Sequence, residues 1–311
     1  MRFDSDDLGN RMKLYEGIEA NRVLIPQLPT MVRLDGKAFH TFTKGLKRPY
    51  DERFANLMSE TTKFLVDKTN ARIGYCQSDE ISLVLYLNDI NSEPIFGGRI
   101  CKLTSVISSM CTAFFNSRLK EYISEKSDAL AYFDCRVWNV PSLTEAANTL
   151  VWRELDATKN AISMAAQSVF SHKQLQGKSG AEMQEMLHQK GINFNDYPAF
   201  FKRGTYVRRI TKKVPFSKEE LKKLPTKHKA HTTPGLMVER SVVERIKLEP
   251  ILKIQNRVEV LFGEKKDKYA MPCPSYKLHD DYCTVFSDLT VCGNAPCMME
   301  RHKPKVSKEK K

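Results

Sequence analysis

Residues 74–82, with the sequence GYCQSDEIS, link two short segments that have the composition of β-strands. The segment before the link (71–76) and the segment after it (81–86) are predicted to pair as a β-hairpin. The tip of this hairpin is QSDE, in which Asp79 and Glu80 are adjacent acids with no cation beside them in the sequence. Such a tip is often only a solvated turn. It is half of a carboxylate metal site if another strand brings a further acid to it.

Asp35 is the candidate for that further acid. Residues 30–36, TMVRLDG, are predicted to form a strand that ends in Asp35, and Gly36 lets the backbone turn sharply there. Mg²⁺ prefers hard oxygen ligands and is usually held by one or two carboxylates, with phosphate oxygens and water completing its shell. Two such ions about 4 Å apart are the usual means of in-line phosphoryl or nucleotidyl transfer. Asp35 beside Asp79 and Glu80 therefore predicts a site for two Mg²⁺ ions.

The length and composition are those of an ordinary globular protein. The chain has 311 residues, of which 41% are hydrophobic and 28% are charged, which suits one large domain or two small ones. No apolar run approaches the ~20 residues of a membrane span, and the acidic N-terminus lacks the apolar core of a secretion signal. The eight cysteines are then most simply free thiols. We therefore expect a cytoplasmic protein with no membrane partner.

Positive charge is concentrated in two parts of the chain. The formal net charge is +13, residues 202–229 carry eleven Lys or Arg against two Glu, and residues 301–311 carry six against one. A basic stretch of this kind suits a polyanion such as nucleic acid, although it can also be a solvated face. We expect the first stretch to contact RNA phosphates and the second to be a disordered tail. The side chains expected to make the phosphate contacts are Arg208, Arg209, Lys212 and Lys213.

The order of the predicted elements gives the fold class. A strand at 30–36 is followed by a helix at 51–68, the hairpin, a helix at 99–124 and a strand at 131–138. This order of strand, helix, strand, strand, helix, strand is the ferredoxin-like βαββαβ unit of an α+β protein. In this topology, which is that of a polymerase or cyclase palm, the acids of the first strand and of the hairpin meet. A further helix is predicted at 143–170.

The same pattern suggests domain boundaries. We expect a catalytic palm with an N-terminal helix over residues 1–141. A helical and basic RNA-gripping region, packed on the palm, is expected over 142–262. Within it, a basic loop at 200–209 leads into a strand, and residues 242–262 add a further helix or strand. Residues 263–311 are expected to be a C-terminal extension that ends in the basic tail.

Three motifs make the chain resemble a known family. They are RLDGKAFH at 33–40, RPYD at 48–51 and YCQSDE at 75–80, with weaker support from FDCR at 133–136, Pro141-Ser142, Trp152-Arg153 and KRGT at 202–205. In this order they resemble the tRNA(His) guanylyltransferase-like 3′–5′ polymerases, over roughly residues 10–210. The N-terminal sequence RMKLYE, at 11–16, is similar to that of the bacterial and phage branch of the family.

The resemblance implies an activity and a site. The family adds nucleotides to the 5′ end of tRNA, and its members are commonly homotetramers. By similarity, two Mg²⁺ ions are held by Asp35, the carbonyl of Gly36 and Asp79, with Glu80 as a further catalytic residue beside them. The nucleoside triphosphate, GTP or ATP, is contacted by Lys37, Ala38, Phe39, His40, Arg48 and Ser78. The second nucleotide or the RNA 5′ end is contacted by Arg136, Asn160, Lys202 and Arg203.

The chain departs from the family pattern at several positions. Guanylyltransferases have a His-Ile-Asn-Asn sequence where this chain has TKNA at 158–161. That His helps to handle the activated 5′ end. Template-directed repair of a tRNA 5′ end is therefore at least as strong a hypothesis as untemplated addition of G to tRNA(His). Arg48 and Arg203 occupy positions where lysine is usual, which keeps the charge and changes the geometry. Cys76 and Cys135 stand where glycine is frequent.

Several of these residues also have purely structural explanations. A His close to two Phe residues, as His40 is, is often a core residue. Trp152, Phe200 and Phe201 are expected to pack rather than to stack on bases, and Cys76 is expected to be a small apolar neighbour of the site rather than a nucleophile. A nucleotide cyclase on the same palm and a non-catalytic RNA-binding protein are the alternative functions. Incubation with a labelled triphosphate, with and without tRNA, separates the three.

Overall fold

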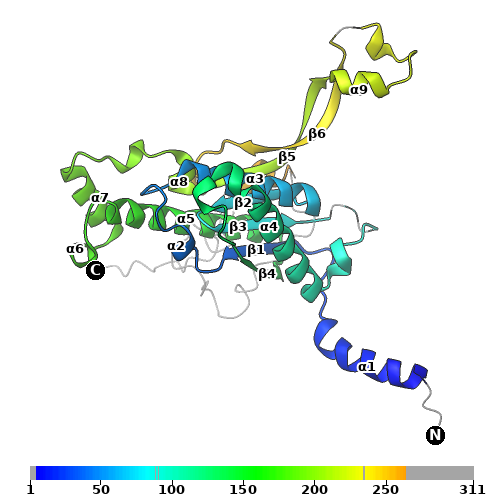
Figure 1. Cartoon of the computed structure of the whole chain (residues 1–311), viewed down its shortest axis with the longest axis horizontal. Helices are drawn as coiled ribbons and strands as arrows, with labels where there is room; N and C mark the ends of the chain where they lie inside the picture. The colour runs from blue at the N-terminus through cyan, green and yellow to red at the C-terminus, as the bar shows by residue number, and fades with distance from the viewer. Residues whose placement is uncertain (1–4, 88, 90, 234, 264–311) are drawn as a thin grey trace, which may run out of the picture.

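The protein is built around one antiparallel sheet of six strands (Figure 1). The structure, a computed structural model, describes residues 5–87, 89, 91–233 and 235–263. The helices and strands before residue 142 are α1 (Ser5–Ala20), β1 (Thr30–Gly36), α2 (Phe39–Phe42), α3 (Glu52–Thr69), β2 (Ile73–Gln77), β3 (Glu80–Leu85), α4 (Ile100–Tyr122) and β4 (Phe133–Asn139). Those after it are α5 (Leu143–Gln167), α6 (His172–Leu175), α7 (Gly180–Gln189), α8 (Ala199–Arg203), β5 (Thr205–Pro215), α9 (Lys218–Lys223), β6 (Met237–Ile246) and α10 (Arg257–Phe262).

The first four strands form the predicted ferredoxin-like unit. The order across the sheet is β4-β1-β3-β2-β5-β6, and its first four members are connected by α3 and α4 as a βαββαβ unit. The predicted hairpin is β2 and β3, which pair from Ile73 opposite Val84 to Gln77 opposite Glu80. Asp51 caps α3, since its side chain accepts a hydrogen bond from the backbone N–H of Arg53.

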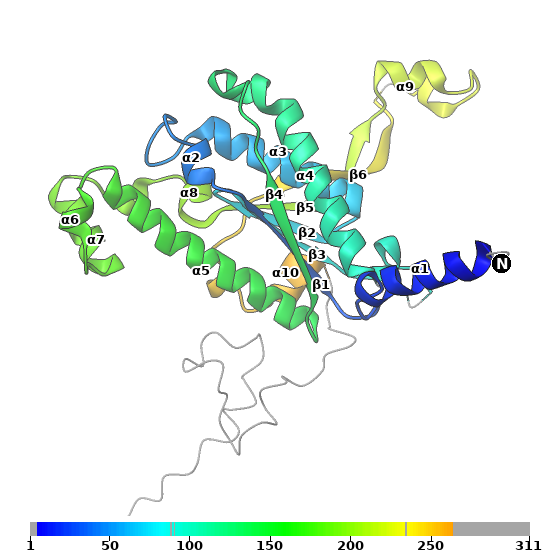
Figure 2. The same cartoon turned by 60° about the horizontal axis from the view of Figure 1, so that its bottom comes forward.

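Helices cover both faces of the sheet (Figure 2). On one face, α3 and α4 contribute Leu57 and Phe115 to the largest hydrophobic cluster. On the other face, Leu150 of α5 belongs to a second cluster together with Met31 and Val84 of the sheet. The predicted unit alone has helices on one face only, so α5 explains why every residue of β3 except the last is buried. In the described part of the chain, no helix is both long enough and apolar enough to cross a bilayer.

Strands β5 and β6 extend the sheet beyond the predicted unit. Because β5 pairs with β2, residues after 142 and residues of the expected palm share one sheet. β6 pairs with β5, and the far part of this pair projects from the body as an arm with α9 close to its end (Figure 1). The expected strand after residue 200 is confirmed as β5, whereas the start of the expected loop is helical and belongs to α8. Residues 242–262 contain the end of β6 and α10. Apart from Gly263, the expected C-terminal extension lies outside the described residues.

Candidate active site

Asp35 occupies the carboxyl end of β1, between two neighbouring strands. It is opposite Glu80 of β3 and opposite Asp134 of β4. Directly opposite side chains in antiparallel strands point to the same face, so the acids of β1 and β3 meet as predicted. Gly36 follows, and a Cβ at this position would lie 2.3 Å from the ring of Phe39. Glycine is therefore required where the chain passes over that buried ring.

The hairpin tip is a two-residue turn, formed by Ser78 and Asp79 between β2 and β3. Ser78 has a φ of 48°, the positive value that two-residue hairpin turns favour at this position. Asp79 and Asp35 line the same cleft. Burial raises the pKa of the Asp79 carboxyl, and the nearby charges of Asp35 and Glu80 raise it further. The turn thus concentrates negative charge at a place where a bound cation would neutralise it.

Glu80 differs from the other two acids because its carboxylate is already bound. Arg153 of α5 donates from Nε to Oε1 and from Nη2 to Oε2 of Glu80, both at 2.6 Å. Both side chains are buried, and Arg153 also donates to Asp156 at 2.9 Å. Trp152, predicted to be a packing residue, is instead 52% exposed, with its ring 4.5 Å from the guanidinium carbon of Arg153. Asp35 and Asp79 remain as the carboxylates available to a metal.

Two adjoining cavities lie between the hairpin tip and α5. The cavity of the carboxylates measures about 460 Å³ and is lined on the α5 side by Arg153, Asp156, Asn160, Ser163, Met164 and Gln167. The neighbouring cavity, which we call the aromatic cavity, measures about 220 Å³. Both are lined by Gln77, Ser78, Asn160, Met164 and Gln167. A ligand that fills both cavities would pass directly over the hairpin tip.

The aromatic cavity combines rings with cations. The ring of Tyr50 lies 5.3 Å from that of Phe200 and 4.9 Å from that of Phe201, measured between centroids. Phe200 and Phe201 therefore pack as expected, and they also line the cavity. Lys47 and Arg48 line the same space. Aromatic faces suit a nucleobase and these cations suit phosphates, so the cavity is chemically matched to a nucleotide.

The predicted nucleotide-binding residues divide into two groups. Arg48 and Ser78 line the cavities, whereas Lys37, Ala38 and His40 lie exposed on the segment after β1. His40 is thus not a core residue, so the purely structural explanation for this histidine is wrong. Phe39 is only 4% exposed and packs in the core, so its side chain supports the turn and does not face the cavities.

Of the four residues predicted to contact the second nucleotide or the RNA 5′ end, one lines the cavities and three do not. Asn160 lines both cavities. Arg136 is exposed on β4 and lies 3.7 Å from Asp134, and neither it nor Lys202 or Arg203 is part of the described lining of either cavity. Arg203 is fixed through its carbonyl, which accepts a hydrogen bond of 2.9 Å from the Tyr75 hydroxyl.

The basic residues predicted to contact RNA lie on β5, where each has a partner within the chain. Arg208 donates to the carbonyl of Val260 at 2.6 Å, and Arg209 donates to Asp67 at 2.9 Å. Lys212 pairs with Glu244, and the ammonium of Lys213 lies 3.9 Å from the carboxylate of Glu239. These side chains therefore lie away from the two cavities, on the β5–β6 pair.

The donor set fits magnesium better than a softer metal. Among the described residues no group of three or more His, Cys, Asp and Glu side chains is placed to hold a metal ion. Asp35, Asp79 and the carbonyl of Gly36 are hard oxygen donors, and Mg²⁺ commonly takes the rest of its shell from phosphates and water. Burial raises the pKa of the Cys76 thiol to about 11, so Cys76 is protonated at neutral pH and is not a nucleophile.

Apart from Asn160, the α5 side chains that line the cleft are not predicted as site residues from the sequence. The sequence motifs include Arg153 without giving it a role, and they do not include Gln167. A usable signal was present, because the polar residues Arg153, Asp156, Asn160, Ser163 and Gln167 recur at intervals of three and four in a helix that is otherwise rich in buried residues. Such spacing places polar side chains on one side of a helix, here the side that lines the cleft.

A palm sheet with strand-end carboxylates beside a nucleotide-sized cavity defines a class of enzyme, the palm-type nucleotidyltransferases. A family model described as tRNAHis guanylyltransferase matches residues 9–141. The tRNA(His) guanylyltransferase of Saccharomyces cerevisiae is 32% identical over 209 residues, which cover 61% of this chain and 86% of the yeast protein.

Solved structures agree with these sequence similarities. A bacterial tRNA(His) guanylyltransferase (Thg1)-like protein in complex with ATP aligns with a TM-score of 0.62 at 41% identity, covering 65% of this chain and 88% of that chain. The corresponding structure in complex with GTP gives a TM-score of 0.59 at 32% identity, covering 76% and 91%. The chain therefore belongs to the tRNA(His) guanylyltransferase family and is a nucleotidyltransferase.

Proposed function

We propose that this enzyme adds nucleotides in the 3′–5′ direction to the 5′ end of tRNA, with Mg²⁺ as its metal and GTP or ATP as substrates. The observation that carries the proposal is the placement of Asp35 and Asp79 in one cleft that continues into the aromatic cavity. The names of the ATP-bound and GTP-bound relatives support the choice of substrates. By family resemblance, the working form is a homotetramer.

The chemistry of growth at a 5′ end fits two adjoining cavities. An incoming nucleotide can join a 5′ end only through its own 3′-hydroxyl. This hydroxyl attacks the α-phosphorus of the 5′-triphosphate of the RNA, and the pyrophosphate that leaves comes from the same 5′-triphosphate. The site must therefore hold a nucleotide and an activated RNA end together, and two connected spaces provide for this. Mg²⁺, when bound, would stabilise the charge that develops on the attacking and leaving oxygens.

The residues of this chain then have separate tasks. Tyr50 and Phe201 hold the base, and Arg48 neutralises phosphate charge beside it. Arg153 keeps the carboxylate of Glu80 engaged, so that Asp35 and Asp79 are the acids left free to orient the reacting phosphates. These tasks are mainly positioning and charge neutralisation, which supply most of the rate in phosphoryl transfer.

Within this activity we favour template-directed repair over untemplated addition of G. The sequence TKNA at 158–161 has no His to assist an activated 5′ end. Thr158, which occupies that His position, bridges two elements instead, since its hydroxyl lies 3.0 Å from the carbonyls of Glu154 and Lys202. Asn160 is the member of this sequence that lines both cavities.

The test uses tRNA that lacks its first nucleotide and carries a 5′-triphosphate. The base opposite the missing nucleotide is varied, and the nucleotide incorporated is identified for each template. We expect the complementary nucleotide to be added, with a requirement for Mg²⁺. Incorporation of G whatever the template base would contradict template-directed repair and support guanylyltransferase activity. Failure to extend any tRNA, with turnover of triphosphate alone, would favour the cyclase.

A further inference from the structure

Helix α1 carries an apolar surface that the rest of its own described chain does not cover. In two views the helix projects away from the body of the protein (Figures 1 and 2). Its apolar side chains are 44–66% exposed: Leu8, Met12, Leu14, Tyr15 and Ile18. None of the three hydrophobic clusters of the described chain includes a residue of α1. An isolated helix of 16 residues is marginal in water, so α1 needs a packing partner.

These apolar residues lie together on one side of α1. Leu8, Met12 and Tyr15 are separated by four and three residues, and Leu14 and Ile18 by four, which places them on neighbouring lines along the helix. Arg11 lies among them and is exposed. The uncovered side of α1 is therefore an apolar strip that also carries the exposed charges of Asp7 and Arg11.

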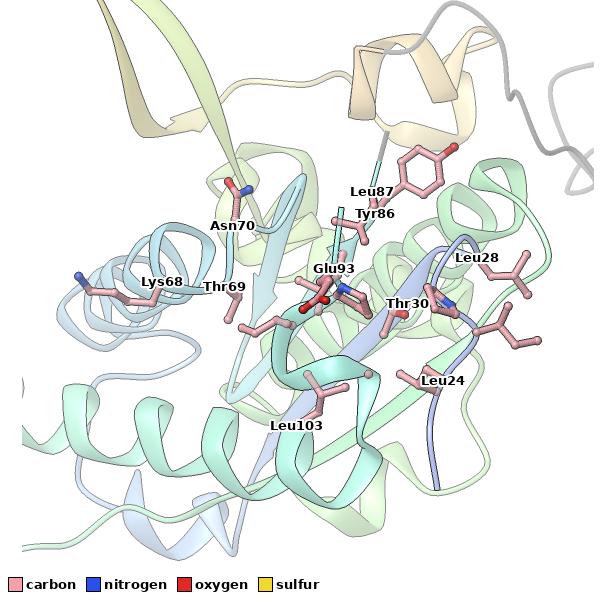
Figure 3. Close-up of a pocket in the computed structure, with 16 residues that line it drawn as sticks. Leu24, Leu28, Thr30, Lys68, Thr69, Asn70, Tyr86, Leu87, Glu93 and Leu103 are labelled. Carbon is pink, nitrogen blue, oxygen red and sulfur yellow. The ribbon is translucent and has the colours of Figure 1, made fainter. Parts of the chain in front are cut away.

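A cavity of complementary character lies at the opposite end of the sheet from the catalytic carboxylates. It measures about 310 Å³, and its walls are mostly apolar, with Leu24, Ile25, Leu85, Leu87 and Leu103 among them (Figure 3). We call it the leucine cavity. The carboxylate of Glu93 points into this space (Figure 3). The cavity thus offers apolar walls, the carboxylate of Glu93, and Lys68, whose ammonium lies 3.9 Å from the Asp67 carboxylate.

The segment between α1 and β1 connects the two features. Val23 is 60% exposed and Ile25 is 57% exposed, and Ile25 forms part of the cavity wall. Exposed apolar surface therefore runs from α1 to the mouth of the leucine cavity. α1 extends away from the body (Figure 1), and none of its described residues lines the leucine cavity.

We propose that α1 of one copy of this chain packs across the leucine cavity of a second copy. Leu14, Tyr15 and Ile18 then cover the apolar walls, and Arg11 pairs with Glu93 of the neighbouring copy. If the contact is reciprocal, each interface buries two helices and two cavities, the arrangement expected of a twofold-symmetric dimer. This inference rests on the self-association stated in the proposed function and is independent of the chemistry, because the carboxylates lie at the other end of the sheet.

Charge reversal tests the contact without disturbing either core. Arg11→Glu and Glu93→Lys each place like charges at the interface, and both residues are exposed, so the chains still fold. We expect each variant to self-associate at least about tenfold more weakly and the mass of the assembly, measured by light scattering, to fall by half or more. Lys13→Glu, on the other side of α1, is the matched control and should leave the mass unchanged.

Mixing the two variants gives the decisive result. In a mixed pair, Glu at position 11 meets Lys at position 93, and Arg11 of the other chain meets the remaining Glu93, so both contacts are attractive again. We expect the mixture to regain the large species, with one chain of each kind in every pair. Contact within one chain cannot produce this rescue.

Other outcomes overturn the inference. It fails if the wild-type chain has the mass of one copy at all concentrations, if the double variant Leu14→Asp/Ile18→Asp keeps the wild-type mass, or if the mixture does not reassociate. Extension of tRNA by the wild-type enzyme is measured in parallel. Intact extension with an unchanged mass in the variants would reject only the α1 contact, whereas absent extension would reject the proposed function.

Discussion

Arg153 donates two hydrogen bonds of 2.6 Å to the two carboxylate oxygens of Glu80, the residue that directly follows Asp79. The pair joins α5 to the start of β3, across 73 positions of sequence. It is buried, and Asp156 accepts a further hydrogen bond from the same guanidinium. The guanidinium neutralises Glu80, one of the two acids of the hairpin, and fixes the turn that carries Asp79.

Replacing Arg153 by Met should be strongly destabilising, because the buried carboxylate of Glu80 then loses its cationic partner and keeps only the hydrogen bond from the Ser82 hydroxyl. Removing one member of a buried ion pair costs about 3–5 kcal/mol, whereas apolar or neutral replacement of both is often tolerated. We therefore expect Arg153→Met to lower the free energy of unfolding by about that amount in urea titrations. The double variant Glu80→Gln/Arg153→Met should recover much of the loss. Equal stability of Arg153→Met and the wild type would contradict the role assigned to this pair.

Asp79→Asn tests the metal site. The substitution keeps the size of the side chain and removes the negative charge that would hold Mg²⁺. We expect nucleotidyl transfer to fall by about 10³-fold or more with an unchanged melting temperature, since charge neutralisation supplies much of the rate. Asp89→Asn, in an exposed loop beyond the other end of β3, is the matched control and should remain fully active. Near wild-type turnover by a folded Asp79→Asn enzyme would refute the assignment.

The central sheet and the position of the two acids could be predicted from the sequence because the signals are local. Each strand of the βαββαβ unit has a β-rich segment of its own, and the acid of β1 and the acids of the hairpin stand at strand ends. Once the topology is that of the ferredoxin-like unit, β1 and β3 are neighbours, so Asp35 must lie beside the hairpin.

Other features depend on contacts between distant parts of the chain. Nothing near Glu80 in the sequence indicates Arg153, and the lining of the aromatic cavity combines Tyr50 with Phe200 and Phe201 from a segment 150 residues later. The sequence near the β5 cations likewise does not indicate their ion-pair partners. Arg209, for example, pairs with Asp67 of α3, so a count of basic residues overstated the free charge of that strand.

Arg209→Ala tests whether the β5 cations contact RNA. Each phosphate contact that is lost should lower the salt slope of tRNA binding by about 1. If Arg209 makes such a contact, the variant shows this decrease, whereas Asp67→Asn, which removes the competing carboxylate, keeps or steepens the slope. The measurement is the dissociation constant of tRNA at several salt concentrations. Unchanged affinity and slope in Arg209→Ala would make this part of β5 a solvated face.

Asp51 is expected to contribute stability that depends on pH. Its buried carboxylate caps α3, and the hydrogen bonds from the Arg53 side chain are the main reason that its pKa is lowered to about 2. Because the folded state binds the proton less readily than the unfolded chain, whose pKa is near 3.9, the contribution is complete above that value. It is lost as the pH falls from about 4 to 2.

The comparison of Asp51→Asn with Asp51→Ala separates charge from capping. Asn is a good N-cap without charge, so Asp51→Asn should lower the free energy of unfolding at pH 7 only through the lost ion pair, by about 1 kcal/mol, since the half-exposed Arg53 is screened by water. Asp51→Ala should lose roughly 1 kcal/mol more, because the cap itself is gone. As the pH falls from 4 to 2, the difference between wild type and Asp51→Asn should shrink towards zero, while the difference between the two variants persists. The free energy of unfolding is measured by urea titration at each pH. If the difference between wild type and Asp51→Asn stays constant from pH 4 to 2, the lowered pKa assigned to Asp51 is contradicted.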